Sequence, residues 1–292
     1  MIISIASGKG GTGKTTVAVN LALSIENAQI LDCDVEEPNV GLFLKPEIKN
    51  KQSAYTLIPE IDDNKCTYCG LCREVCEYNA LVVIPPKSEG KKGNVLVFPH
   101  LCHGCGACAL LCPQGAISEI KKEIGIIESG NSGKVDFVHG KLNIGEVMAP
   151  PLIRQVKELA DKELADNKKT VIIDAPPGTS CPVIAAVKGS DYCVLVTEPT
   201  PFGLNDLILA VEVLRKLKIP FGIVINRSDI GDNKTEEYCM ENDISILMRI
   251  PFDRDIAVSY SKGIPFVMVK PQYKELFYNM LGNIKANIKG EN

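Results

Sequence analysis

The chain has 292 residues, of which 45% are hydrophobic and 23% are charged, and its formal net charge is −4. This composition excludes a disordered chain, which would carry fewer apolar residues and a larger net charge. The mild acidity gives no electrostatic reason to expect a nucleic acid as a partner.

The first elements in the chain alternate between strand and helix. Residues 2–6 form an apolar run typical of a buried strand, a glycine-rich turn covers 8–13, and 14–25 carry apolar residues at helical spacing. A second strand is predicted over 28–31. This order predicts a parallel sheet with a right-handed crossover.

Cysteines dominate the next stretch. The sequence contains twelve, and eight of them fall between Cys66 and Cys112. A disulfide-stapled secreted scaffold would be shorter and would follow a signal peptide, whereas MIISIASGKGG lacks a basic region and a cleavage site. No apolar run approaches the ~20 residues that span a bilayer. We therefore expect a cytoplasmic protein whose cysteines serve metal or redox chemistry.

These cysteines belong to an internal duplication. Each half consists of a cysteine run followed by an apolar stretch, the first from Cys66 to Ile84 and the second from Cys102 to Ile120. A polar loop over 85–94 separates the two halves. The duplicated segment, residues 60–120, is predicted to be a small domain inserted into a larger one.

After residue 121 the alternation of strands and helices resumes. A hairpin is predicted over 125–138 with its turn at 129–133. The remaining predicted strands cover 170–173, 192–197, 221–225 and 244–250, and the helices cover 151–165, 204–217, 235–242 and 273–288. The larger domain is therefore expected to be a discontinuous, doubly wound α/β domain made of residues 1–59 and 121–292.

The turn after the first strand fits the phosphate-loop pattern G-x-x-x-x-G-K-[ST]. Glycines let backbone N–H groups converge on phosphate oxygens, and the following helix presents its positive end to the same anion. Lys14 can reach the β- and γ-phosphates, the Thr15 hydroxyl is placed for Mg²⁺, and Thr16 can bond the α-phosphate. A turn that binds nothing is the alternative, but the strand before it and the helix after it argue against that. The predicted nucleotide-binding residues of the loop are Gly8, Gly10, Gly11, Thr12, Gly13, Lys14, Thr15 and Thr16.

A second lysine, Lys9, lies inside the loop, where a generic phosphate loop does not require one. The resulting sequence KGGTGKTT resembles the deviant phosphate-loop family that includes MinD, ParA, the nitrogenase iron protein and the Mrp-type iron–sulfur carriers. The resemblance implies an ATP-dependent homodimer in which Lys9 contacts the partner's ATP and contributes to catalysis. A solvated surface lysine is the alternative.

Two aspartates after the second strand extend the resemblance. The sequence DCD at 32–34 matches the first switch of the family, which implies that Asp34 orients and activates the attacking water and that Asp32 supports Mg²⁺. Carboxylates at strand ends fit this chemistry, because open α/β sheets bind ligands at the carboxyl ends of their strands. Taken alone, either aspartate could instead cap a helix or a turn.

Three further positions match the family downstream. The sequence DAPPGT at 174–179 resembles the second switch, which implies that Asp174 holds a Mg²⁺-bound water and that the Gly178 N–H senses the γ-phosphate. Asn226 aligns with an asparagine that contacts adenine, although it could simply end a strand. Pro251, with the two residues after it, resembles the loop that closes the base pocket.

Both cysteine runs have the spacing C-x2-C-x2-C-x3-C of bacterial two-cluster ferredoxins. In that pattern each cluster takes three thiolates from one run and the fourth from the other, where the fourth cysteine is expected to begin a following helix. Zinc is the alternative, but two identical four-cysteine runs favour iron–sulfur clusters. The expected ligands are Cys66, Cys69, Cys72 and Cys112 for one [4Fe–4S] cluster, and Cys102, Cys105, Cys108 and Cys76 for the other.

The other four cysteines are expected to be ordinary buried thiols, except that Cys181 lies close to the second switch and could have a function. Mrp-type carriers hold a bridging cluster on a C-x-x-C pair near the C-terminal half, and no such pair follows Cys112. A bridging, transferable cluster is therefore not expected here.

The resemblance covers nearly the whole chain and implies its fold and function. The implied fold is a doubly wound, mostly parallel P-loop NTPase sheet with an inserted α+β ferredoxin domain. The implied function is a Mg²⁺-dependent ATPase with two [4Fe–4S] clusters, slow or activated by a partner, that couples its nucleotide state to electron transfer or cofactor assembly. A nucleotide-switched positioning protein of the MinD or ParA type is the alternative, but the polar tail NIKANIKGEN is poorly suited to insert into a membrane.

Overall fold

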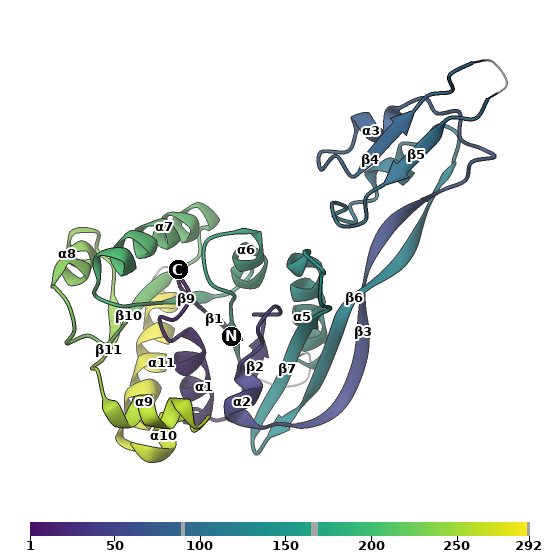
Figure 1. Cartoon of the computed structure of the whole chain (residues 1–292). Coiled ribbons are helices and arrows are strands. Elements are labelled where there is room, and N and C mark those ends of the chain that lie inside the picture. The colour runs from purple at the N-terminus through teal and green to yellow at the C-terminus, as the bar shows by residue number, and fades with distance from the viewer. Residues whose placement is uncertain (89–90, 165–168, 291–292) are drawn as a thin grey trace. The chain divides into compact units, whose positions relative to one another are not determined.

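The computed structural model describes residues 1–88, 91–164 and 169–290 (Figure 1). These residues form two compact units. Unit 1 consists of residues 1–52, 127–141 and 153–292, and unit 2 consists of residues 53–126 and 142–152. The chain crosses between the units four times, between residues 52 and 53, 126 and 127, 141 and 142, and 152 and 153.

The larger sheet has nine strands in the order β11-β10-β9-β1-β8-β2-β7-β6-β3, and a two-stranded sheet pairs β4 with β5. All the strand pairs from β11 through to β7 are parallel. The mostly parallel α/β sheet predicted from the sequence is therefore confirmed. The strands are β1 (Ile2–Ala6), β2 (Ala28–Asp32), β3 (Glu47–Ile61), β4 (Leu81–Ile84), β5 (Asn94–Val97), β6 (Ile117–Ser132), β7 (Val135–Leu142), β8 (Thr170–Asp174), β9 (Tyr192–Thr197), β10 (Phe221–Asn226) and β11 (Ile246–Ile250).

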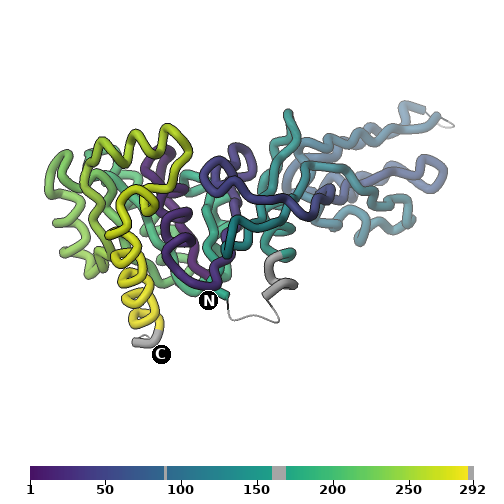
Figure 2. Tube along the Cα trace, turned by 90° about the horizontal axis from the view of Figure 1, so that it is seen from below, coloured from purple at the N-terminus to yellow at the C-terminus, as the bar shows by residue number. Residues whose placement is uncertain are grey.

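Helices connect the strands and cover both faces of the sheet in unit 1 (Figure 1). The α1 and α11 helices lie side by side on one face, where Val17 and Leu21 share an apolar core with Phe277, Leu281 and Ile284 (Figure 2). The α6 and α7 helices contact β1, β8 and β9. The helices are α1 (Lys14–Ser24), α2 (Val40–Leu44), α3 (Leu71–Glu74), α4 (Ala107–Leu110), α5 (Ala149–Leu164), α6 (Cys181–Val187), α7 (Pro201–Leu217), α8 (Lys234–Glu241), α9 (Arg254–Ser261), α10 (Phe266–Val269) and α11 (Gln272–Gly290).

The central strands are apolar on both faces, as parallel strands between two helical layers must be. Every residue of β9 is buried, and so is every residue of β2. This burial holds the carboxyl ends of β1, β2 and β8 in fixed positions at one edge of the sheet.

Unit 2 repeats one motif twice, as the duplicated sequence predicts. In the first half α3 leads into β4, and in the second half α4 leads into β6. The third cysteine of each run, Cys72 or Cys108, lies within the short helix. The expectation that the fourth cysteine begins a helix is wrong, because Cys76 and Cys112 follow the helices and lead through a turn into a strand.

The hairpin predicted over 125–138 is present but longer, since it is formed by β6 and β7. Its turn lies at 133–134 rather than over 129–133, because Gly133 adopts a φ of 56° that suits a tight turn.

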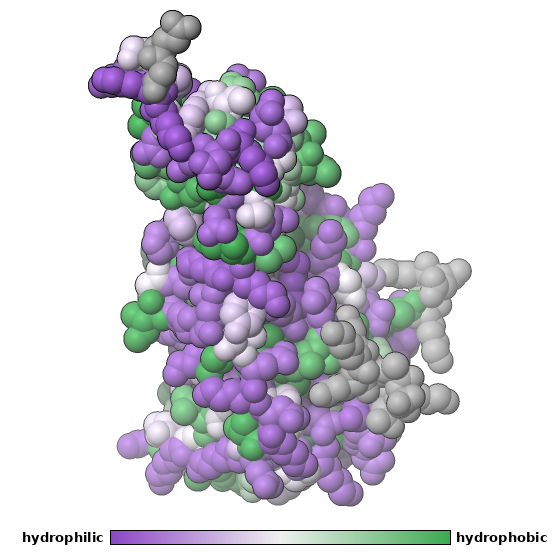
Figure 3. All heavy atoms as spheres, turned by 90° about the vertical axis from the view of Figure 1, so that its right-hand side faces the viewer, coloured by the Kyte–Doolittle hydropathy of each residue, from purple (hydrophilic) through white to green (hydrophobic). Residues whose placement is uncertain are grey.

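The face drawn in Figure 3 is largely hydrophilic, with hydrophobic residues in separate small groups. Within the described part of the chain, no helix combines the length and the apolar character needed to cross a membrane.

Candidate functional site

The phosphate loop connects β1 to α1 in unit 1. The strand ends at Ala6 and the helix begins at Lys14, with Gly13 in the left-handed conformation at the helix cap, where φ is 98°. Gly8 lies so close to α7 that a Cβ atom would come within 2.1 Å of the Asp206 carbonyl oxygen. Only glycine fits this close approach, which fixes the entrance of the loop against the helix.

A cavity of about 430 Å³ lies next to the loop. Its lining includes the polar or charged side chains Lys14, Thr15 and Asp34 and the aromatic side chains Phe252 and Phe266. A cavity of this size, lined by both charged and aromatic side chains next to a phosphate loop, suits a nucleotide, with its phosphates at the loop and its base against the aromatic side chains. The predicted residues that line it are Gly10, Gly11, Gly13, Lys14, Thr15, Thr16, Asp34, Asn226 and Pro251.

Asp174 ends β8 beside the loop and is 1% exposed. The Thr15 hydroxyl donates a hydrogen bond of 2.6 Å to its Oδ2 atom, while its Oδ1 atom is buried without a hydrogen-bond partner among the described residues. Burial raises the pKa of Asp174 to about 7. A buried carboxylate with a free oxygen beside a threonine hydroxyl fits a site for Mg²⁺ and its bound water.

Asp32 lies opposite Asp174 on the neighbouring strand β2 and is fully buried. Its carboxylate accepts hydrogen bonds from the backbone N–H groups of Asp34, at 3.2 Å, and Val40, at 2.9 Å. Burial and the neighbouring Asp174 raise its pKa well above the ordinary value. Neither Asp32 nor Asp174 lines the cavity, and the two bonds to Asp32 fix the chain segment that carries Asp34.

Lys14 and Asp34 both line the cavity and interact electrostatically. Burial lowers the pKa of Lys14, and the negative charges of Asp174 and Asp34 oppose this effect. Burial raises the pKa of Asp34, and the Lys14 ammonium partly offsets the rise. The site therefore gathers one ammonium and several carboxylates in a region of low solvent access, where each charge acts strongly on its neighbours.

Lys9 and Gly178 lie outside the cavity lining. Lys9 is half-buried, and its carbonyl oxygen accepts a 2.5 Å hydrogen bond from the Ser7 hydroxyl. The Gly178 N–H donates a 3.0 Å bond to the Ser7 carbonyl oxygen. In this conformation the Gly178 N–H is therefore engaged by the chain itself rather than directed into the cavity.

Asn226 ends β10 and lines the cavity. Its Nδ2 atom donates a 2.9 Å hydrogen bond to the Thr12 carbonyl oxygen, and its Oδ1 atom accepts one from the Arg227 N–H. The amide thus ties the phosphate loop to β10 in addition to lining the cavity. Thr12 itself is buried and does not line the cavity.

The sequence motifs did not identify several apolar and aromatic residues that line the cavity, among them Ile256, Tyr260 and Phe266. They belong to α9 and α10, in a stretch that carries no recognisable motif. Asp253 caps α9 by accepting a 2.7 Å bond from the Asp255 N–H, and the Lys270 ammonium bonds to the same carboxylate. This capped and charge-paired turn holds the aromatic wall in place.

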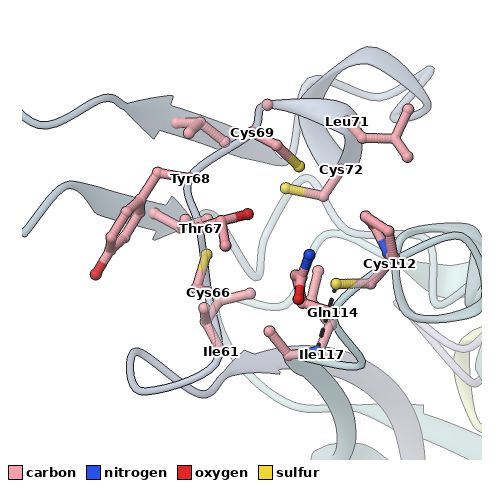
Figure 4. Close-up of a pocket in the computed structure, with 15 residues that line it drawn as sticks. Ile61, Cys66, Thr67, Tyr68, Cys69, Leu71, Cys72, Cys112, Gln114 and Ile117 are labelled. Carbon is pink, nitrogen blue, oxygen red and sulfur yellow. Dashed lines mark hydrogen bonds between the residues drawn. The ribbon is translucent and has the colours of Figure 1, made fainter.

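Unit 2 contains two further cavities, each surrounded by four cysteines. Cys66, Cys69 and Cys72 of the first run and Cys112 of the second line one of them. Figure 4 shows that these four side chains direct their sulfurs toward a common space. The second cavity is lined by Cys102, Cys105, Cys108 and Cys76. The two runs therefore exchange their fourth cysteines, and each set is the one expected from the sequence.

The cysteine runs wrap tightly around these cavities. Gly70, Gly104 and Gly106 have φ angles of 88°, 65° and 73°, which side chains with a Cβ atom rarely adopt. A backbone N–H also bonds to the fourth sulfur of each set, from Ala80 to Cys76 at 3.3 Å and from Ala116 to Cys112 at 3.4 Å. Such bonds to sulfur are typical of iron–sulfur sites, where they stabilise the thiolate.

Four thiols around one cavity form a donor set that an iron–sulfur cluster can use. Among the described residues, no group of three or more His, Cys, Asp or Glu side chains is arranged to hold one metal ion. Burial raises the pKa of the Cys72 and Cys102 thiols, and that of Cys108 to about 11, so a thiolate here needs positive charge from a bound group.

Outside unit 2, Cys33, Cys193 and Cys239 are buried, as expected for ordinary thiols. Burial raises the pKa of all three, which makes them unreactive. Cys181 is exposed at the first residue of α6.

Comparison with known proteins decides the family. Residues 3–266 match the model of the CobQ/CobB/MinD/ParA nucleotide binding domain. The chain belongs to this family. The P-loop fold and nucleotide binding expected from KGGTGKTT follow from that membership.

Among relatives of this CobQ/CobB/MinD/ParA protein, an uncharacterized protein of Methanocaldococcus jannaschii is 35% identical over 91% of each chain. The iron-sulfur cluster carrier protein of Pyrococcus horikoshii is 24% identical, over 99% of this chain and 88% of its own length. The septum site-determining protein MinD of Pyrococcus horikoshii, solved in complex with Mg-ADP, is 22% identical with a TM-score of 0.57, over 96% of this chain and 93% of its own. The last likeness concerns the fold.

Proposed function

We propose that this protein is a Mg²⁺-dependent ATPase that holds two [4Fe–4S] clusters and couples its nucleotide state to electron transfer or to the assembly of an iron–sulfur or metal cofactor. The observation that carries the proposal is that one chain contains a P-loop cavity and two four-cysteine cavities with exchanged fourth ligands. The iron-sulfur cluster carrier name of relatives about 24% identical supports it further.

In the proposed binding step, the N–H groups around Gly10 to Gly13 surround the phosphates of ATP and Lys14 neutralises their charge. The base lies against the aromatic side chains of the cavity. The magnesium ion would be held by the Thr15 hydroxyl and, through water, by Asp174, and it would supply positive charge to the β- and γ-phosphates.

In the proposed hydrolysis step, Asp34 accepts a hydrogen bond from a water molecule and orients it toward the γ-phosphorus. The new P–O bond forms as the bond from the γ-phosphorus to the bridging oxygen breaks, which yields ADP and inorganic phosphate. The raised pKa of Asp34 favours transfer of the water proton to its carboxylate. Lys14 stabilises the charge that develops on the transferred group.

A homodimer is part of the proposal. Lys9 lies on the loop outside the cavity lining of its own chain, as a residue that reaches the ATP of a second copy would. The Gly178 N–H would have to leave the Ser7 carbonyl to contact the γ-phosphate, so nucleotide binding would rearrange the second switch.

The two sets of cysteines in unit 2 would hold one cluster each, and the clusters would supply one-electron redox chemistry. Thiolates of this kind persist where thiols stay reduced, which makes the cytoplasm the proposed location.

The experiment that tests this proposal is metal analysis of protein purified without oxygen. We expect about eight iron and eight sulfide ions per chain, an EPR signal on reduction, and ATP hydrolysis that requires Mg²⁺. The Cys72→Ser variant should lose about half of the iron, whereas Cys181→Ser, which changes an exposed cysteine outside unit 2, should keep all of it. Finding zinc, or no cluster, would overturn the proposal.

A nucleotide-switched positioning protein is the second candidate, favoured by the fold likeness to MinD structures. Sedimentation with lipid vesicles and with DNA, each with and without MgATP, tests it. ATP-dependent co-sedimentation would favour positioning over redox coupling.

A further inference from the structure

The two cysteine cavities are equivalent by duplication, yet their linings differ in charge. At a constant offset along the chain, Cys66 corresponds to Cys102 and Ala80 to Ala116. Each lining residue of one cavity can therefore be compared with its counterpart in the other. The following inference rests on the proposed function, because it concerns how the chain treats two bound clusters.

Several determinants of a cluster's reduction potential are matched between the cavities. Potentials depend on hydrogen bonds to the sulfurs, on solvent exposure and on nearby charge. Each cavity has one backbone N–H bond to its fourth sulfur, at 3.3 Å from Ala80 to Cys76 and at 3.4 Å from Ala116 to Cys112. The second cysteine of each run is exposed and the other three are half-buried. The hydrogen bonds to the fourth sulfur and the exposure of the cysteines therefore give little reason for the two reduction potentials to differ.

Charge is not matched. The residues that line the first cavity, all within the described part of the chain, include no Asp, Glu, Lys or Arg, and Val83 of β4 is one of them. Its counterpart in the second cavity is Glu119 of β6. A Cβ atom built on Gly106 would lie 3.4 Å from Oε1 of Glu119, so this carboxylate lies against the second cysteine run.

The aromatic side chains at the two cavities also differ, but in both directions. The rings of Tyr78 and His103 stack at the second cavity, with centroids 3.5 Å apart and an angle of 11° between their planes. Their counterparts at the first cavity are the smaller Gln114 and Thr67. The first cavity in turn is lined by Tyr68, whose counterpart at the second cavity is Gly104, so aromatic cover does not distinguish the two cavities.

We propose that Glu119 gives the cluster held by Cys76 and the second run a lower reduction potential than the other cluster. The electron of a singly reduced protein then rests in the cavity of Cys66, Cys69, Cys72 and Cys112. An electron from a one-electron donor, such as a reduced viologen, that enters at the second cavity passes to the first. That transfer oxidises the second cluster and reduces the first, so the protein as a whole gains a single electron.

The test is a redox titration followed by EPR on the full, cluster-loaded chain at a single fixed pH. We expect two separate midpoint potentials. In Glu119→Gln, which removes the charge and keeps the shape, the lower potential should rise while the higher one stays unchanged. At a fixed applied potential, the ratio of the reduced to the oxidised form of that cluster should increase severalfold.

The matched variants place the same carboxylate in the other cavity. Val83→Glu should lower the higher potential relative to Val83→Gln, which controls for packing and polarity at that position. The inference is overturned if Glu119→Gln moves neither potential, or moves the higher one. Two clusters with one shared potential would refute this asymmetry and leave the proposed function intact, whereas a chain without clusters would refute both.

Discussion

The nucleotide cavity and the cysteine cavities are built in different ways. The nucleotide cavity gathers residues from the ends of β2 and β10 and from α9, and the fully buried strands of the sheet fix their positions. The cysteine cavities are formed by two short runs that wrap around glycines. In residues 53–126, within the part that the structure describes, the buried hydrophobic residues are only Ala54, Ala80, Leu81, Ala116 and Ile124. The sheet thus organises the first site by its own burial, whereas we expect the second to depend on the proposed clusters to complete its core.

The largest expected effect comes from a single substitution that should impair the nucleotide site and leave the cysteine cavities unchanged. Lys14→Ala should reduce ATP hydrolysis by about 10²–10³-fold, because it removes the ammonium that stabilises the transferred phosphoryl group. Its iron content should equal that of the wild type, since Lys14 belongs to unit 1. Phosphate release and iron analysis on the same preparation test this. A variant that lost its iron as well would show that the two regions do not fold independently.

Removal of the iron should instead destabilise the cysteine-containing region and leave the nucleotide site largely unchanged. After iron is chelated, we expect limited proteolysis to cut within residues 53–126, because little apolar burial remains there. The affinity of unit 1 for a nucleotide should change by less than about twofold. Equilibrium binding of a fluorescent ATP analogue, with and without chelation, makes the comparison. Resistance of residues 53–126 to the protease after complete iron loss would contradict this view of its core.

A smaller effect is expected from the buried carboxylates. The pKa of Asp174 is about 7 in the fold and about 3.9 in an unfolded chain. The folded state therefore binds more protons than the unfolded state between pH 4 and pH 7, so the free energy of unfolding falls as pH rises through this window. Without Mg²⁺, the free energy of unfolding of the wild type should fall by roughly 2–4 kcal/mol more than that of Asp174→Asn between pH 4 and pH 7. Urea unfolding followed by circular dichroism at several pH values measures the difference, and parallel curves for the two proteins would contradict it.

The smallest effect concerns the aromatic wall. Lys270→Met removes the ammonium that pairs with Asp253 and lies 3.3 Å from Asp255, so the turn before α9 should loosen. We expect nucleotide affinity to fall severalfold with little change in the maximal rate, because Lys270 does not line the cavity. Lys262→Met, which changes the residue just after α9 instead, is the control. A reduced maximal rate with unchanged affinity would indicate a different role for Lys270.

The same contrast explains what the sequence could predict. The phosphate loop and the cysteine runs depend on fixed spacing within a few residues, so motifs revealed them. The strands β9 and β10 were predicted to within a residue, because buried parallel strands are continuous apolar runs. The exchange of Cys76 and Cys112 between cavities followed from the duplicated spacing.

Features that depend on distant partners were not predicted. The long strand β3 is mostly exposed over its first half and carries no clear alternation, so only its pairing at the sheet edge defines it. Tyr260 and Phe266 belong to the nucleotide cavity because α9 and α10 fold back toward the phosphate loop. The bond between the Gly178 N–H and the Ser7 carbonyl was also invisible in the sequence, since it joins two loops on neighbouring strands.

The central claim is that nucleotide and clusters communicate within this chain. The most direct measurement is the rate at which pre-reduced, cluster-loaded protein passes electrons to a small one-electron acceptor, with and without MgATP, in the wild type and in Lys14→Ala. The account predicts that MgATP changes this rate in the wild type and has no effect in Lys14→Ala. Equal rates with and without MgATP in a wild-type protein that hydrolyses ATP and holds both clusters would contradict it.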